Sequence, residues 1–214
     1  MTHIIETVAY SFSELSEKAK DKARDALRYT GHYLEHGWWD SVYDDAARAA
    51  TILGLDIMET ERPRKNKAYL VPAINFSGFS SQGDGACFRG SYCFNPKAVA
   101  EIQDYCNDAE LLRIATELHT LQLARRLHGF APFKASITTS GRYSHSHSMS
   151  VDVEYDECAE DEIDAITDEV TQIMRDFADW IYNSLEAEHD YLMSDECVDQ
   201  ELSEENFDED GNSI

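Results

Sequence analysis

Three groups of residues have the types and spacing that ligand-binding or catalytic sites use. His145 and His147 are two residues apart, so on a strand both imidazoles would lie on the same side, as metal-binding pairs require. Cys87 and Cys93 are close enough in sequence to suggest another pair of metal ligands. The backbone amides of Gly83-Asp84-Gly85 can approach a phosphate.

The sequence completes none of these sites. No second cysteine pair follows at zinc-finger spacing, and a third ligand for the histidines would have to come from His119, His128 or Cys87 through the fold. The glycine turn matches neither the P-loop nor the dinucleotide fingerprint, which favours a hairpin turn. The serines lack the G-x-S-x-G and S-x-x-K motifs of nucleophilic catalysis. We therefore expect buried or incidental thiols, exposed loop histidines, no cofactor and no enzymatic activity.

The spacing of apolar residues predicts an α/β protein of the α+β type, with a mixed, largely antiparallel sheet, flanking helices and a long acidic C-terminal helix. The expected strands are residues 3–10, 68–76, 86–94, 133–143 and 149–155. The expected helices begin at Ser13 or Ser16, Trp38, Asn95-Pro96, Asp108, Ala159 and Ser194. Residues 61–67 look turn-like, and the polar tail after residue 205 should be frayed. We expect an α/β core at 1–158 and an acidic helical segment at 159–214 packed on it, together forming one domain.

The negative charge is concentrated in the last third of the chain. The 214 residues carry a formal net charge of −24. Residues 151–214 hold 24 acidic residues and one basic residue, Arg175, whereas residues 1–150 hold 18 acidic and 17 basic residues. The net charges are therefore −23 and −1. Because a salt-adapted protein would spread acidity over its whole surface, this asymmetry indicates a local function.

Residues 159–193 combine an apolar seam with an acidic stripe. The seam predicts a packing face: Ile163, Ile166, Val170, Ile173, Phe177 and Trp180, followed by Ala187 and Tyr191. At about 100° per residue, the acids roughly opposite it are Asp161, Asp164, Asp168, Asp179, Glu186 and Asp190, with Asp176 and Glu169 beside them. From Asp161 to Asp190 the stripe spans about 44 Å, comparable to about 13 base-pair steps of a duplex.

The acidic stripe allows three interpretations. A row of carboxylates can imitate a phosphate backbone and occupy a basic groove of another protein. The same row can serve only as a solvated face. Binding of a divalent cation is the third interpretation, although the sequence contains no EF-hand loop.

The remaining composition bears on location. No stretch approaches the roughly 20 apolar residues of a membrane span. The N-terminus lacks the basic and apolar regions of a signal peptide, and five scattered cysteines do not suit a secreted disulfide framework. We expect a cytoplasmic protein without membrane contact.

Five stretches resemble a family of small phage and prophage proteins often labelled as an antitoxin of a toxin–antitoxin stability system. They are residues 10–20 (YSFSELSEKAK), 38–43 (WWDSVY), 76–88 (FSGFSSQGDGACF), 149–155 (MSVDVEY) and 191–196 (YLMSDE). The resemblance implies an accessory protein acting in the bacterial cytoplasm. Acidic phage proteins of this size often resemble DNA mimics or anti-CRISPR inhibitors.

Charge and resemblance together predict a non-enzymatic inhibitor that docks on the basic, nucleic-acid-binding groove of a host or defence protein without binding nucleic acid itself. The residues expected to make the contact are Asp161, Asp164, Asp168, Asp176, Asp179, Glu186 and Asp190. One alternative is an antitoxin that covers a toxin through exposed aromatics such as Tyr182, Tyr191 or Phe207. The other is a metal-dependent enzyme centred on His145 and His147.

Overall fold

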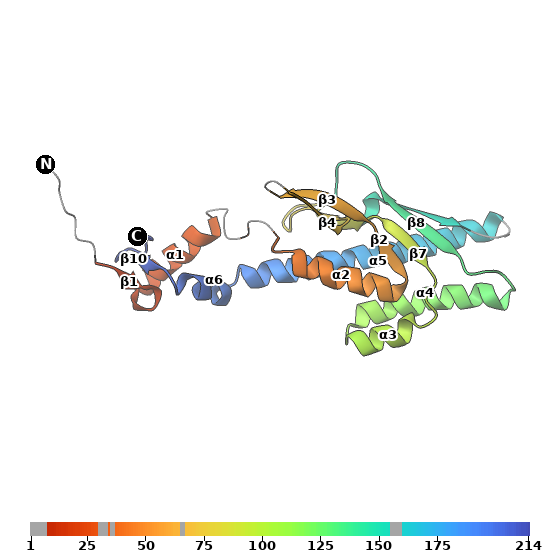
Figure 1. The fold of residues 1–214 in the computed structure, drawn as a ribbon, viewed down its shortest axis with the longest axis horizontal. Helices are drawn as coiled ribbons and strands as arrows, with labels where there is room; N and C mark the ends of the chain where they lie inside the picture. Colours follow the sequence, from red (N-terminus) through yellow and green to blue (C-terminus); the bar gives the residue numbers. More distant parts are fainter. Residues whose placement is uncertain (1–7, 30–33, 35–36, 65–66, 155–159) are drawn as a thin grey trace. The chain divides into compact units, whose positions relative to one another are not determined.

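The computed structural model describes residues 8–29, 34, 37–64, 67–154 and 160–214, excepting the side chains of residues 63, 64, 67 and 160–163. The chain forms two compact units (Figure 1). The larger unit is Asp40–Glu186, and the smaller unit joins Met1–Trp39 with Ala187–Ile214. None of the described helices has the length and apolar character that a membrane crossing needs.

A four-stranded antiparallel sheet organises the larger unit. Its order is β2 (Leu55–Ile57), β7 (Gly90–Cys93), β8 (Lys134–Thr139) and β9 (Met149–Glu154). Tyr92, Ala135 and Val153 pair across three strands and are all buried. Side chains alternate along each strand, so the adjacent row, Ser91, Ser136 and Asp152, lies on the opposite, polar face. One face of the sheet therefore joins the core.

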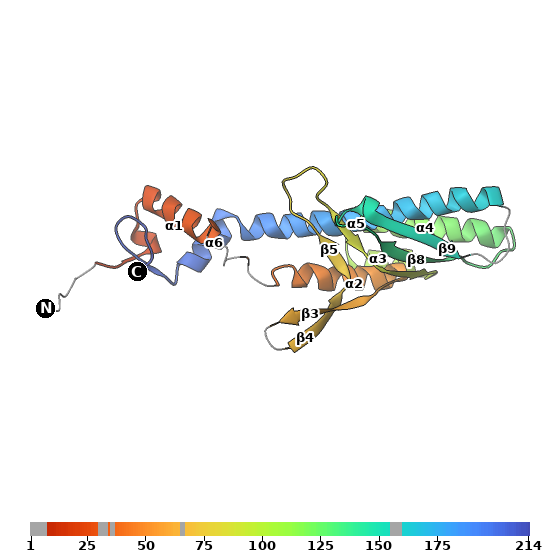
Figure 2. The ribbon, with the colours of Figure 1, turned by 90° about the horizontal axis from the view of Figure 1, so that it is seen from above.

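The helices of the larger unit are α2 (Asp40–Leu53), α3 (Ala98–Tyr105), α4 (Ala109–Leu127) and α5 (Glu160–Leu192) as far as Glu186. Both views show α4 and α5 side by side (Figures 1 and 2). Asp108 fixes the N-terminal end of α4 to α5. One of its carboxylate oxygens caps α4 by accepting hydrogen bonds from the amides of Glu110 and Leu111, each at 2.9 Å, and the other accepts one from Trp180 Nε1 at 2.9 Å.

Two hairpins complete the larger unit. β3 (Glu59–Arg64) pairs with β4 (Lys67–Pro72), and β5 (Ile74–Phe76) pairs with β6 (Ala86–Phe88), both antiparallel. The expected strand at 68–76 is thus two strands, which end and begin on either side of Ala73. The turn-like interpretation of residues 61–67 was wrong for 61–64 and 67, which lie in β3 and β4. Residues 65 and 66 lie outside the described part of the chain.

The smaller unit brings the two ends of the chain together. β1 (Tyr10–Ser11) and β10 (Asn206–Phe207) pair antiparallel, and the single turn η1 (Phe12–Glu14) precedes α1 (Glu17–Tyr29), which packs with α6 (Asp195–Leu202). Its core contains Phe12, Leu15, Ala19, Ala23, Val198, Leu202 and Phe207. The expectation of a frayed tail was wrong, because Phe207 is buried in this core.

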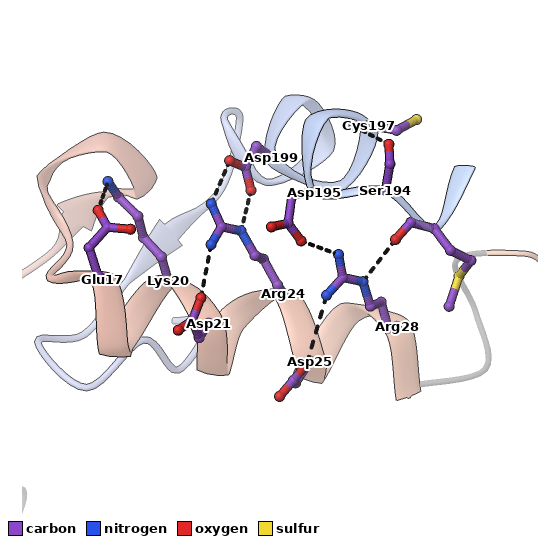
Figure 3. Close-up of polar contacts among 11 residues, drawn as sticks. Glu17, Lys20, Asp21, Arg24, Asp25, Arg28, Ser194, Asp195, Cys197 and Asp199 are labelled. Carbon is purple, nitrogen blue, oxygen red and sulfur yellow. Dashed lines mark hydrogen bonds and ion pairs between the residues drawn. The ribbon is translucent and has the colours of Figure 1, made fainter. Parts of the chain in front are cut away.

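Ion pairs join α1 to α6, as Figure 3 shows. Arg24 holds the carboxylate of Asp199 with two nitrogens, at 2.6 and 2.7 Å. Arg28 contacts Asp195 at 2.5 Å and donates a hydrogen bond to the carbonyl of Met193. Because these arginines sit among acids of both helices, the charge of the smaller unit is partly neutralised.

The predicted fold class is confirmed. The structure combines helices with antiparallel sheets and has a long C-terminal helix. The units have boundaries other than the predicted division at residue 158: α5 up to Glu186 belongs to the larger unit, and the last 28 residues, Ala187–Ile214, group with the N-terminal segment. Of the expected first strand, residues 3–7 lie outside the described residues, and Tyr10 lies in β1.

Candidate acidic binding surface

The apolar seam of α5 is buried over its central turns. Val170, Ile173 and Phe177 are at most 5% exposed, as the sequence predicted, and Met174, Ala178, Ile181 and Leu185 are fully buried as well. The buried line continues in steps of four through Ile181 and Leu185. It therefore passes by Ala187 and Tyr191, both exposed, and their assignment to the seam was wrong.

The structure divides the predicted stripe by exposure. Asp164, Asp168 and Asp179 are exposed side chains on the larger unit, and we call these three the outward row. Glu186 is half-buried at the end of that unit, and Asp190 is exposed on the smaller unit. The side chain of Asp161 lies outside the described residues.

Asp176 is neutralised within the chain. Arg113, on α4, contacts the Oδ2 atom of Asp176 at 2.6 Å, and Gln172 Nε2 donates a hydrogen bond to Oδ1 at 2.7 Å. The same guanidinium contacts Glu110 at 2.5 Å and Glu117 at 2.8 Å. Hydrogen bonds to Glu110 first, then to Asp176 and Glu117, raise the pKa of Arg113 above its ordinary value. Asp176 therefore belongs to a side facing α4 and not to the outward row.

No comparable partner neutralises the outward row. Within the described part of the chain, Asp164, Asp168 and Asp179 make no ion pair. Arg175 lies on the same helix, half-buried, and its Nε atom has no hydrogen-bond partner in the structure. The three carboxylates thus remain available to an external cation or basic surface.

The glycine-rich loop between β5 and β6 forms a hairpin connection, as the sequence favoured. The Oδ2 atom of Asp84 accepts hydrogen bonds from the amides of Ser80 and Ser81, at 3.0 and 2.7 Å. Its carboxylate occupies the donors that a phosphate would need, so the loop supplies its own anion.

The same loop is packed against α5. Tyr182 donates a hydrogen bond from its hydroxyl to the carbonyl of Gly78 at 3.0 Å, and its ring lies 5.4 Å from that of Phe79. Phe79 also stacks on Phe76 at 5.8 Å. These contacts fix the loop on α5, the helix that carries the outward row.

The histidine and cysteine candidates do not gather into a metal site within the described residues. His145 and His147 stack with ring centroids 5.3 Å apart, and His145 Nδ1 accepts a hydrogen bond from the amide of His147 at 3.1 Å. Cys87 is buried in β6, where desolvation raises the pKa of its thiol. Cys93 is exposed on β7.

The aromatic residues of the antitoxin alternative are only partly accessible. Tyr191 is 55% exposed, whereas Tyr182 is half-buried against Phe79. Phe207 is 1% exposed, and its ring meets that of Phe12 at 6.0 Å. The expectation that Phe207 contacts a partner is therefore wrong, since it is a core residue of the smaller unit.

Comparison with known proteins gives a family without an assigned activity. A family model described as "Domain of unknown function (DUF8835)" matches residues 38–195. No curated protein and no solved structure matches the chain significantly. The matched range contains every acidic residue of the predicted stripe.

Proposed function

We propose that this chain, which belongs to the DUF8835 family, is a non-enzymatic inhibitor that binds a basic, nucleic-acid-binding surface of a host or defence protein. The observation that carries the proposal is the outward row, Asp164, Asp168 and Asp179, exposed and without an ion pair among the described residues. Uncompensated charge on a rigid helix favours electrostatic docking. The resemblance to phage accessory proteins supports a bacterial, cytoplasmic setting and an anti-CRISPR-like or DNA-mimicking role.

The contrast with other acids supports a function in binding rather than in solubility alone. In α1, Glu17, Asp21 and Asp25 each pair with a base three residues further along the helix. Such pairing keeps a surface charged and soluble without like-charge repulsion. The residues of the outward row have no such pairing among the described residues.

The spacing of the carboxylates in the outward row determines how closely they match the charge density of a phosphate backbone. Fifteen residues of helix from Asp164 to Asp179 cover about 22 Å, over which one strand of a duplex carries about six or seven phosphates. Three carboxylates supply less than half of that density. We therefore expect the complex to be salt-sensitive but less steeply so than the nucleic acid it displaces.

The test is a pull-down with the tagged full chain from bacterial lysates that carry defence systems, washed at low and at moderate salt. We expect a basic nucleic-acid-binding protein that is retained at low salt and released at moderate salt. The triple variant Asp164→Lys, Asp168→Lys, Asp179→Lys should not retain it, while the single variant Asp152→Lys, on the exposed face of β9, should. Retention that is indifferent to salt and to the triple variant would contradict the electrostatic proposal and favour apolar contact.

A further inference from the structure

α4 and α5 run antiparallel and leave a groove between them. Near the start of α4, Asp108 contacts Trp180 and Arg113 contacts Asp176. Near the end of α4, His128 and Ala165 line one cavity. Sequence numbers rise along α4 as they fall along α5. α4 and the part of α5 that lines the groove lie within the larger unit, so the groove is a property of one compact body.

One half of the groove is lined by both acidic and apolar side chains. It holds a cavity of about 420 Å³. Glu117, Glu169 and Asp176 line this cavity together with one base, Arg113, and the apolar residues Leu121 and Ile173. Three carboxylates against one guanidinium leave a formal net charge of −2. Arg113 pairs with Glu117 and Asp176 as well as with Glu110, whereas Glu169 has no ion pair among the described residues. This half has the chemistry to accept a further cationic head group on an apolar stem.

The other half of the groove is apolar. Leu121, Ala124, Phe130, Ala165 and Ile166 line a cavity of about 220 Å³ that adjoins the first at Leu121. Arg125 also lines it, but its guanidinium lies 5.3 Å from the ring of Phe130, and its Nε donates a hydrogen bond to the carbonyl of Ala131. This half therefore suits an aliphatic or aromatic side chain.

We infer that the α4–α5 groove is the place where the proposed partner inserts a basic amphipathic helix; this inference rests on the proposed function. The acidic half suits a cationic side chain, and the other half, where Arg125 is held by Phe130 and Ala131, suits an apolar side chain of the same occupant. The centres of the two halves, near Glu117 and near Arg125, are about 12 Å apart along α4. That distance is about two helical turns, so the occupant presents an apolar residue and a Lys or Arg seven or eight positions away on one face.

The probe is a synthetic helical peptide of about 16 residues with Leu and Arg seven positions apart on an Ala/Gln background, fluorescently labelled. A second peptide has the same composition but places the Arg two positions further on, which turns it to another face. We expect the full chain to bind the first peptide at least about tenfold more tightly than the second by fluorescence anisotropy at low salt. Equal binding of the two peptides, or no binding of the first at millimolar concentration, would overturn the inference.

Three variants locate the binding. Glu117→Gln combined with Glu169→Gln should lower affinity for the Arg peptide about tenfold or more, with little effect on a peptide in which Arg is replaced by Gln. Ala124→Trp, which fills the apolar half, should weaken both. Asp152→Lys changes charge outside the groove and should leave the affinity within about twofold. An equal loss in Asp152→Lys would mean non-specific attraction and would refute the groove as the site.

The outcomes separate the inference from the proposed function. If the peptide binds the groove but the lysate yields no salt-sensitive partner, the groove stands and the inhibitor proposal fails. If a salt-sensitive partner is captured equally by wild type and the Glu117/Glu169 variant, the inhibitor proposal stands and the groove fails. A second copy of the chain is another possible occupant of the groove, and sedimentation of the chain without peptide tests for it. Self-association that depends on the groove residues would also overturn the inference.

Discussion

The side-chain amide of Gln122 connects α4 to the segment that enters β8. Its Nε2 atom donates a hydrogen bond to the carbonyl of Phe133 at 3.0 Å, and its Oε1 atom accepts one from the amide of Phe133 at 3.1 Å. The residue has no exposed surface. A single side chain thus satisfies both backbone groups of a buried residue and fixes α4 to the segment that precedes β8.

The change Gln122→Met keeps the size of the side chain and removes both hydrogen bonds. Because the amide and carbonyl of Phe133 would then be buried without partners, we expect the free energy of unfolding to fall by about 2–4 kcal/mol. Urea denaturation followed by circular dichroism measures this loss. The matched control is Gln103→Met on the exposed side of α3, which should change stability by less than about 0.5 kcal/mol. Equal effects at the two positions would contradict the role given to Gln122.

At this scale the sequence predicted residue types better than residue partners. The exposed positions of Asp168 and Asp179 follow from helical spacing alone, since they lie opposite Val170 and Phe177. The pairing of Asp176 with Arg113 does not, because the two residues are 63 positions apart and meet only when α4 packs on α5. In the sequence, the position of Arg113 between Glu110 and Glu117 indicates ion pairs within α4. It does not indicate the pair with Asp176.

Elements with strong local signals were predicted closely. The helix expected from Asp108 to Leu127 is α4, Ala109–Leu127, with Asp108 as its N-cap. The strand β3 (ETERPR) was missed because its residues do not alternate between apolar and polar types. It is a strand because it pairs with β4. β10 was missed for a similar reason: two residues form a strand only because β1 lies opposite them.

The contact between α1 and α6 has an electrostatic component with a defined pH range. Hydrogen bonding to the Arg24 guanidinium lowers the pKa of Asp199 from its ordinary value. A carboxyl whose pKa is lower in the folded state stabilises that state above its unfolded pKa, about 3.9, and this contribution is lost as the pH falls through the folded value. The smaller unit should therefore weaken in acid.

The change Asp199→Asn removes this titration. We expect the variant's smaller unit to be less stable at neutral pH by up to about 1 kcal/mol, the usual range for a partly exposed pair, and to lose less stability between pH 5 and pH 2. Protection factors of the α6 amides against hydrogen exchange, measured across this range, provide the test. Glu196→Gln is the control, an exposed acid on the same helix without an ion pair among the described residues. Identical acid sensitivity of wild type and Asp199→Asn would refute the assignment.

Across the whole molecule, acidity has two different structural consequences. In the smaller unit, Asp195 and Asp199 meet Arg28 and Arg24, so their charge contributes to packing. In the larger unit, the outward row makes no ion pair within the described residues, and Asp164 and Asp168, four positions apart, repel each other. Paired acids thus contribute to packing, as Asp176 also does with Arg113 in the larger unit, whereas the unpaired acids of the outward row do not.

If the outward row is kept for binding, it should reduce stability. The variant Asp164→Asn, Asp168→Asn, Asp179→Asn removes like charges, and we expect the free energy of unfolding to rise by up to about 1 kcal/mol at low salt. The gain should shrink as salt is added, because an ionic strength of 0.15 M screens exposed charges beyond about 8 Å. Thermal unfolding at several salt concentrations measures both effects.

The single change Asp176→Asn is the matched control, since it makes the same substitution on the same helix where the carboxylate is paired. It leaves Arg113 with Glu110 and Glu117 only, so stability should fall at every salt concentration. Opposite signs for the two variants would mean that α5 carries one set of acids for packing and another that costs stability while it remains unbound. If the triple variant is destabilised instead, the outward row is a structural part of the fold, and the proposed binding function loses the observation that carries it.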